Sequence, residues 1–190
     1  MSPKSSKRGF TLVEIAAVVA LIGIMLAIAV PLFKTHLESA QNAKFMADLR
    51  TFSGAFETYR TENGAWPPDQ PRDQSFPSGM ESYLEGSGWE ESSSLGGSFF
   101  FDSLRLHSGV PWPAVISIGD YSSGTAQVPV RASPEQLAAI DQAIDDGNLS
   151  TGNFRQGFQN MPILILDGTY ASYQAIAKEH DKNGTSAPSW

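Results

Sequence analysis

The chain has 190 residues, no cysteine and a formal net charge of −7 at pH 7. This length suits one membrane anchor and one modest globular domain. The acidic balance argues against binding to nucleic acid or anionic lipid through a general basic field, and the absence of cysteine excludes disulfides.

The first element is an apolar run close to the N-terminus. Residues 10–33 contain a single ionisable side chain, Glu14, and the nine residues before them carry Lys4, Lys7 and Arg8 but no acid. As a helix the run would be about 36 Å long, enough to cross a hydrocarbon core of about 30 Å. The basic flank predicts a cytoplasmic N-terminus, with the rest of the chain on the opposite side of the membrane.

Two simpler interpretations of this run are a cleaved secretory signal peptide and a plain signal anchor. The run is longer than an ordinary signal-peptide core, and the residues 31–34 that follow it, Pro-Leu-Phe-Lys, fit poorly with cleavage there. A plain anchor has no use for Glu14, because a carboxylate inside a membrane helix is costly and usually marks a function.

The hexapeptide Gly9-Phe10-Thr11-Leu12-Val13-Glu14, followed by the apolar run, resembles the processing site of type IV pilins and of type II secretion pseudopilins. The resemblance implies that a dedicated membrane peptidase cuts after Gly9, methylates the new N-terminal Phe10 and leaves Glu14 for assembly. Residues 1–9 would be the prepilin leader, and their removal would take the formal charge to −10.

The pairing of Phe10 with Glu14 has a physical basis. After cleavage, the Phe10 amine and the Glu14 carboxylate would be opposite charges one helical turn apart in an apolar layer. They could pair within one subunit or between subunits, and leaving one partner alone would be strongly unfavourable. The resemblance implies the pairing between subunits, with three kinds of partner: copies of this chain and related pseudopilins, the prepilin peptidase and methyltransferase, and an inner-membrane assembly platform.

Gly23 and Pro31 interrupt the apolar run. Pro31 has no N–H to donate to the carbonyl of Ala27, so a kink or a weak turn is expected there. In the resembling family the corresponding backbone loosens in filaments. The alternative is a proline that is tolerated near a membrane boundary.

Residues 34–63 are expected to continue the helix with an amphipathic pattern. Apolar side chains recur at spacings of 4, 3, 4 and 3, at Phe45, Leu49, Phe52, Phe56 and Tyr59. This stripe predicts a helix face that packs on a sheet. Asn63-Gly64 is a C-terminal stop, so one helix is predicted from about Thr11 to Glu62.

The remaining residues predict a globular domain over 64–180 and a mobile tail over 181–190. Its expected elements are a short helix within 78–86 capped by Ser78, strands at 98–106, 114–118, 126–130 and 161–166, and a strand or short helix at 170–178. Pro129 marks 126–130 as an edge strand. A helix from Ser133 to Gly147 has a serine cap, Pro134 at its first position and Gln136 as a capping-box residue. The predicted class is α+β, in which a long N-terminal helix packs on a small antiparallel sheet with one short capped helix inserted.

Few residues suggest a catalytic, metal-binding or phosphate-binding site. His36, His107 and His180 have no metal-ligand spacing, and no nucleophile elbow or phosphate loop is present. Three acids, Asp141, Asp145 and Asp146, crowd the end of the predicted helix and oppose its dipole. Pseudopilins have an acid-lined calcium loop, so calcium is one interpretation. Solvation, or pairing with Arg131 or Arg155, is the other. No other cofactor is expected, and no enzymatic activity.

Two classes of function remain. The first is a structural filament subunit, most simply a type II secretion pseudopilin or else a type IV pilus subunit for adhesion, motility or DNA uptake. The second is a membrane-anchored periplasmic binding or enzymatic domain that uses the same processing signal. The expected location is the bacterial inner membrane, crossed once, with the C-terminal domain in the periplasm. The lack of cysteine and the pattern of residues 63–97 favour the secretion type.

Overall fold

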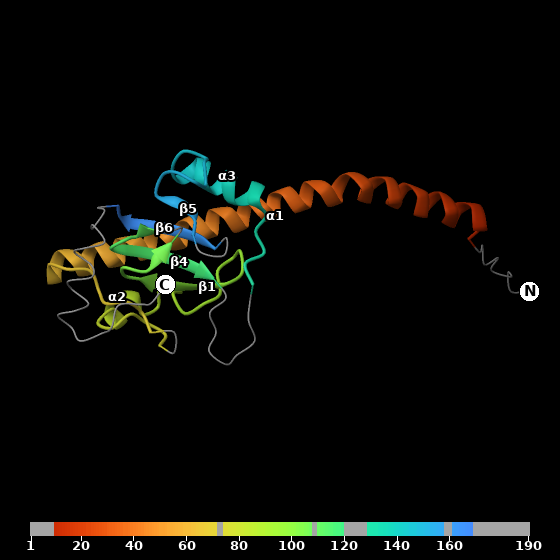
Figure 1. Cartoon of the computed structure of the whole chain (residues 1–190). Coiled ribbons are helices and arrows are strands. Elements are labelled where there is room, and N and C mark those ends of the chain that lie inside the picture. The colour runs from red at the N-terminus through yellow and green to blue at the C-terminus, as the bar shows by residue number, and fades with distance from the viewer. Residues whose placement is uncertain (1–9, 72–73, 108–109, 120–128, 158–160, 169–190) are drawn as a thin grey trace, which may run out of the picture. The chain divides into compact units, whose positions relative to one another are not determined.

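The computed structural model describes residues 10–71, 74–107, 110–119, 129–157 and 161–168. The chain divides into two compact units, Met1–Ala40 and Gln41–Trp190, which are described separately. The boundary lies inside the segment 34–63, which the sequence predicts to be amphipathic. Figure 1 labels the helices and strands.

The helix α1 (Leu12–Asn63) runs through both units. In the first unit its large apolar side chains, from Leu12 to Leu37, are all exposed within the chain. In the part of the chain that the structure describes, α1 is the one helix that is long and apolar enough to cross a membrane. The helix continues through Pro31 without interruption, and the Thr35 hydroxyl donates to the Pro31 carbonyl at 3.2 Å. The predicted long helix is confirmed.

In the second unit α1 carries the predicted apolar stripe. Phe45, Leu49, Phe52 and Phe56 are buried, and Tyr59 is half-buried. The helix ends at the predicted stop, where the next residue, glycine 64, has a φ of +74° that suits glycine.

The stripe packs on a four-stranded antiparallel sheet with the order β1-β4-β6-β5 (Figure 1). Its strands are β1 (Ser98–Asp102), β4 (Ala114–Gly119), β5 (Phe154–Gln156) and β6 (Pro162–Asp167). The strands predicted at 114–118 and 161–166 are thus confirmed, each within one residue. The predicted α+β class is confirmed as well.

Aromatic rings join the helix to the sheet. Phe56 stacks on Phe101 of β1 with ring centroids 4.5 Å apart, and Phe52 meets Phe99 edge-on at 4.8 Å. Trp89 from the connecting loop closes the group, 5.0 Å from Phe52. The period of the stripe and the alternation of β1 therefore place their large rings in one core.

The strand predicted at 98–106 is wrong at its C-terminal end. β1 stops at Asp102, because the backbone of Leu104 turns into the left-handed region with a φ of 59°. The Leu104 N–H then donates to the Trp112 carbonyl at 2.9 Å. A separate two-stranded pair follows, β2 (Leu106–His107) with β3 (Val110–Pro111).

The helix α3 (Pro134–Ile144) begins as predicted, and the Ser133 hydroxyl accepts the Gln136 N–H at 3.2 Å. Gln136 itself does not complete a capping box. Its side-chain amide donates to Asn42 Oδ1 of α1 at 2.8 Å and so ties α3 to the long helix. The Gln136 side chain thus bonds a residue of another helix and not the N-terminus of its own helix.

The short helix α2 (Glu81–Leu84) lies where a helix was expected, but Ser78 does not cap it. Met80 occupies the N-cap position of α2. Its side chain makes no capping hydrogen bond and is buried in the core. The strand predicted at 126–130 lies mostly outside the described residues, and the described positions 129 and 130 are not in a strand. The predictions for 170–178 and 181–190 lie wholly outside them, and β5 was not predicted.

Candidate functional site

The candidate assembly site is the N-terminus of α1, where Thr11 and Glu14 bond each other in both directions. The Glu14 carboxylate accepts the Thr11 N–H and the Thr11 hydroxyl, each at 2.8 Å. The Glu14 N–H donates to the Thr11 hydroxyl oxygen at 3.3 Å. This is the reciprocal arrangement of a capping box, which satisfies donors that the first turn of a helix leaves free.

The sequence analysis did not identify this capping box, although its signal is present. A threonine followed three residues later by glutamate, directly before an apolar run, is the usual sequence pattern. In the uncut chain, Phe10 has a peptide N–H instead of an amine, and both hydrogen bonds from Thr11 go to one oxygen of Glu14, Oε2. The predicted pairing of Glu14 with a Phe10 amine needs the cut chain and stays a prediction.

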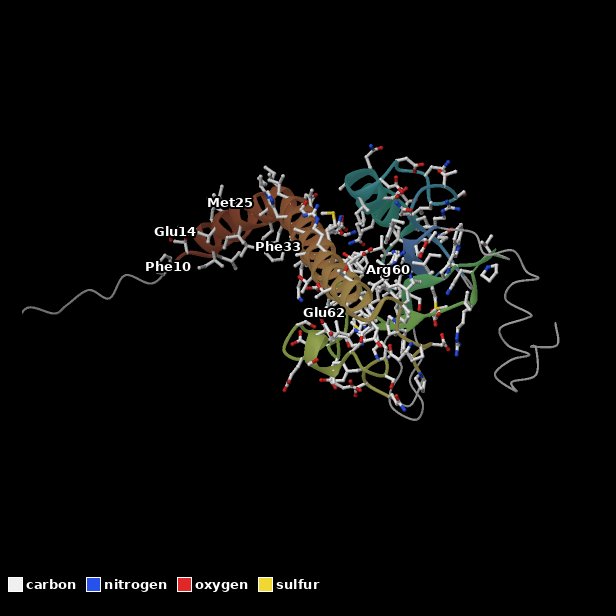
Figure 2. All side chains as sticks on the ribbon, turned by 90° about the vertical axis from the view of Figure 1, so that its left-hand side faces the viewer. Phe10, Glu14, Met25, Phe33, Arg60 and Glu62 are labelled. Carbon is white, nitrogen blue, oxygen red and sulfur yellow. The ribbon has the colours of Figure 1, made fainter. Side chains whose placement is uncertain are left out.

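The surroundings of this site are apolar and open within the chain. Phe10 is 83% exposed, and Glu14 lies beside it on the exposed start of the helix (Figure 2). The side chains of Met25 and Phe33 further along are also exposed, and Figure 2 shows them pointing away from the ribbon. A single carboxylate at the end of an unburied apolar helix can select a partner that supplies a cation.

Gly23 and Pro31 both lie on this exposed part of α1. A Cβ built on Gly23 meets nothing within 4 Å, so packing within the chain does not require glycine there. Their predicted role in loosening the helix stays a prediction. The processing role of Gly9 lies outside the described residues.

The three acids that were considered for calcium differ in their surroundings. Asp141 lies on the inner face of α3 and is fully buried, and neither of its carboxylate oxygens has a hydrogen-bond partner among the described residues. Burial raises the pKa of the Asp141 carboxyl, and the charges of Asp146 and Asp145 raise it further. The Asp141 carboxyl therefore loses its proton at a higher pH than an exposed aspartate does.

The other two acids are exposed and already bonded. Asp146 accepts the Thr151 hydroxyl at 2.6 Å and the Asn148 N–H at 2.8 Å, and these bonds lower the pKa of its carboxyl. The Asp145 carboxylate accepts the Asn153 N–H. Across the described ranges, no group of three or more His, Cys, Asp or Glu side chains is placed to hold a metal ion. Calcium at Asp141, Asp145 and Asp146 stays a prediction that this geometry does not support.

Comparisons with known proteins agree with the N-terminal site. Residues 4–30 match the family described as the prokaryotic N-terminal methylation motif. Over 66 residues the chain is 35% identical to fimbrial protein EcpC of Eikenella corrodens, an alignment that covers 35% of this chain and 43% of the relative. Over 61 residues it is 34% identical to type II secretion system core protein G of Klebsiella pneumoniae, covering 32% and 44%.

The chain thus spans less than half the length of these two relatives. Among solved structures, the major type IV pilin PilA1 of Clostridium difficile superposes with a TM-score of 0.47 at 17% identity, covering 70% of this chain and 98% of the pilin. The chain thus carries the N-terminal methylation motif at residues 4–30, and about a third of its length is similar to type IV fimbrial proteins and to type II secretion core protein G.

Proposed function

We propose that this chain is a structural, non-catalytic subunit of a membrane-assembled helical filament, of the type II secretion pseudopilin kind. The observation that carries the proposal is the exposed apolar surface of the first unit. Sixteen large apolar side chains from Phe10 to Leu37 are each about half exposed or more. Contiguous apolar surface of this extent marks a membrane or a protein interface. A lipid bilayer before assembly and neighbouring helices after it would each cover that surface.

Glu14 supports the filament over a simple anchor. Helices in a bilayer gain little from apolar contact with one another, because lipid is equally apolar. A charged pair can therefore decide which register two helices adopt. In the cut chain, the Phe10 amine of an entering subunit would compete with Thr11 for the Glu14 carboxylate of a subunit already in the filament.

Two observations bear on the choice between a secretion filament and a pilus. The relatives include both fimbrial proteins and secretion core protein G. The absence of cysteine favours the secretion type, since many type IV pilins close a C-terminal loop with a disulfide. A type IV pilus subunit is the second candidate, favoured by the identity to the fimbrial protein EcpC.

The proposal includes a location and partners. The basic residues 4–8 would keep the N-terminus in the cytoplasm, α1 would cross the inner membrane once, and the second unit would lie in the periplasm. The partners would be further copies of this chain and related pseudopilins, together with the prepilin peptidase and methyltransferase and an inner-membrane assembly platform.

Two substitutions at Glu14 test the proposal and separate its charge from its capping role. We expect Glu14→Leu to be inserted in the membrane and cut, but to fail to form filaments in cells that lack the wild-type copy. Glu14→Gln keeps an acceptor for the capping box but loses the charge, and we expect it to fail as well. Glu38→Gln, an exposed acid on the same helix beyond the apolar run, is the control and should assemble normally.

The measurements are membrane fractionation for insertion, intact mass for cutting, and electron microscopy with a shearing assay for filaments. Normal filaments from Glu14→Leu would refute the pairing and favour the anchored periplasmic domain. Filaments from Glu14→Gln but not from Glu14→Leu would show that the capping box matters and the charge does not. Parallel assays of protein release and surface piliation in the native host would separate the secretion filament from the pilus.

A further inference from the structure

A pocket of about 360 Å³ lies in the second unit, away from the core that α1 covers. Its lining includes His107, Trp112, Leu149, Ser150, Arg155 and Ile163. Side chains alternate along β6, so Leu164 packs in the core with α1 whereas Ile163 belongs to a second apolar cluster on the other face of the sheet. The pocket therefore uses a face of the sheet that takes no part in the apolar stripe.

His107 supplies a buried polar atom that has no partner. The residue is 4% exposed, and its Nδ1 atom has no hydrogen-bond partner among the described residues. Its Nε2 atom lies 3.2 Å from Asp102 Oδ2, which also accepts the Ser117 hydroxyl. Nε2 lies close to that carboxylate without a hydrogen bond of regular geometry, so both ring nitrogens are buried polar atoms without a hydrogen-bond partner among the described residues.

The backbone of Gly157 packs closely against the Nδ1 atom of His107. A Cβ built on Gly157 would lie 3.0 Å from His107 Nδ1 and 2.6 Å from Ile163 Cγ2. Real Cβ atoms tolerate neither approach well, so any larger residue would displace the side chains that line this part of the pocket.

Arg155 supplies a positive charge with a set orientation. Its guanidinium carbon lies 5.3 Å above the centre of the Trp112 ring, and its Nε donates to the Gly152 carbonyl. The ring and the carbonyl hold the guanidinium plane, while the Nη groups are donors suited to a bidentate acceptor. The Arg155 charge helps to lower the pKa of Asp146, but the Asp146 carboxylate already accepts hydrogen bonds from Thr151 and Asn148.

We infer that this pocket binds a small organic carboxylate with an apolar body. The Arg155 fork matches a carboxylate. In the tautomer whose Nε2–H faces Asp102, the Nδ1 atom of His107 is an acceptor suited to an N–H or O–H group of the same ligand. Ile163, Leu149 and the Trp112 ring provide apolar surface for the rest of the molecule. The volume lies at the lower end of the range for small-molecule sites, which is about 300–1,000 Å³.

The test uses the full chain in detergent micelles, labelled with 5-fluorotryptophan, and benzoate as the probe. The chain has four tryptophans, so Trp112→Phe identifies the Trp112 fluorine signal. We expect benzoate to shift that signal saturably, with a dissociation constant in the millimolar range. Benzamide, which has the same shape without the charge, should bind at least about tenfold more weakly, a difference of about 1.4 kcal/mol.

Arg155→Gln should weaken benzoate binding by at least the same factor. The matched control is Arg50→Gln, which removes an equal charge from an exposed arginine of α1 that does not line the pocket. It should leave the affinity unchanged, which excludes a general electrostatic effect.

Three results would overturn the inference: no saturable shift, an equal response to benzamide, or undiminished affinity in Arg155→Gln. If the other three fluorine signals show that Arg155→Gln does not fold, Arg155→Lys decides instead. Lysine keeps the charge but loses the fork, so binding should still weaken. Unchanged affinity in Arg155→Lys would then overturn the assignment of a bidentate carboxylate.

Discussion

Asp141 shows at the scale of one residue how burial changes the character of an acid. It lies on the buried face of α3 beside Leu137 and Ile140, where the fold removes water from its carboxylate. A buried carboxylate without hydrogen bonds favours its neutral form. Its exposed neighbour Asp146, bonded by Thr151 and Asn148, favours the charged form. The pKa values of two acids five residues apart are therefore shifted in opposite directions, and their contributions to stability change with pH in opposite senses.

We predict that Asp141→Asn stabilises the second unit near pH 7. The folded pKa of Asp141 is raised, so its contribution to stability is fully present below the unfolded pKa and is lost as pH rises through the folded value. A neutral asparagine would avoid the free-energy cost of the buried charge. The gain should shrink toward pH 3, as measured by urea unfolding followed by tryptophan fluorescence.

Asp146→Asn is the matched control, with the opposite sign. Its folded pKa is lowered, so its contribution is present above the unfolded pKa and is lost as pH falls. Asp146→Asn should therefore destabilise the protein at pH 7 and have little effect in acid. A wild-type protein that is more stable than Asp141→Asn at pH 7 would contradict a raised pKa of Asp141.

At the scale of elements, the second part of α1 owes its position to one row of rings. Phe45, Phe52 and Phe56 are each fully buried against the sheet or the loop that carries Trp89. The segment just after the C-terminal end of the helix is also bonded to the sheet, because the Trp66 Nε1–H donates a hydrogen bond to Asp167 of β6 at 2.9 Å. Arg60 lies between the two, 4.7 Å above the Trp66 ring and 3.6 Å from the Asp167 carboxylate. The helix is thus held along its length and at its end.

We predict that Phe52→Ala lowers the free energy of unfolding of the second unit by about 3–5 kcal/mol. The reason is a cavity left at the centre of the aromatic group, which the sheet and the helix cannot both close. Thr51→Ala, at the exposed neighbouring position, should change the stability by less than about 0.5 kcal/mol. Equal urea midpoints for Phe52→Ala and the wild type would mean that the stripe faces something other than this sheet.

For the whole molecule, the same α1 has two different environments along its length. Within the chain its first unit buries none of its apolar side chains, whereas the second buries its apolar stripe. A prepilin-type cut would remove only the basic leader and leave the exposed apolar helix on the mature protein. That arrangement is useful only if something else covers the helix.

We therefore predict one cut, between Gly9 and Phe10, with a methylated amine on Phe10. The reason is the match of residues 4–30 to the N-terminal methylation motif. Intact mass and N-terminal sequencing of protein extracted from membranes measure both changes. An N-terminus at Met1 or Ser2, or one beyond Phe33, would be incompatible with prepilin processing. Gly9→Leu should block the cut, whereas Ser6→Ala, in the same leader, should not.

Local features of the sequence determined the elements that form without distant partners. The spacing of Phe45, Leu49 and Phe52 predicted the helix and its buried face, because a 3.6-residue period is a property of the helix itself. Ser133 predicted the start of α3, because a cap bonds an N–H three residues away. The pattern from Thr11 to Glu14 also contained its capping box, since both partners lie in one turn.

Tertiary structure decided the features whose partners lie far apart in the chain. Gln136 bonds Asn42 instead of its own helix start, which no local pattern records. The burial of Asp141 and the pocket between His107 and Arg155 likewise exist only once β2, α3 and β5 are in place. Burial and long-range contact change the energy of a polar group by removing its water, and that change depends on what the folded chain places beside it.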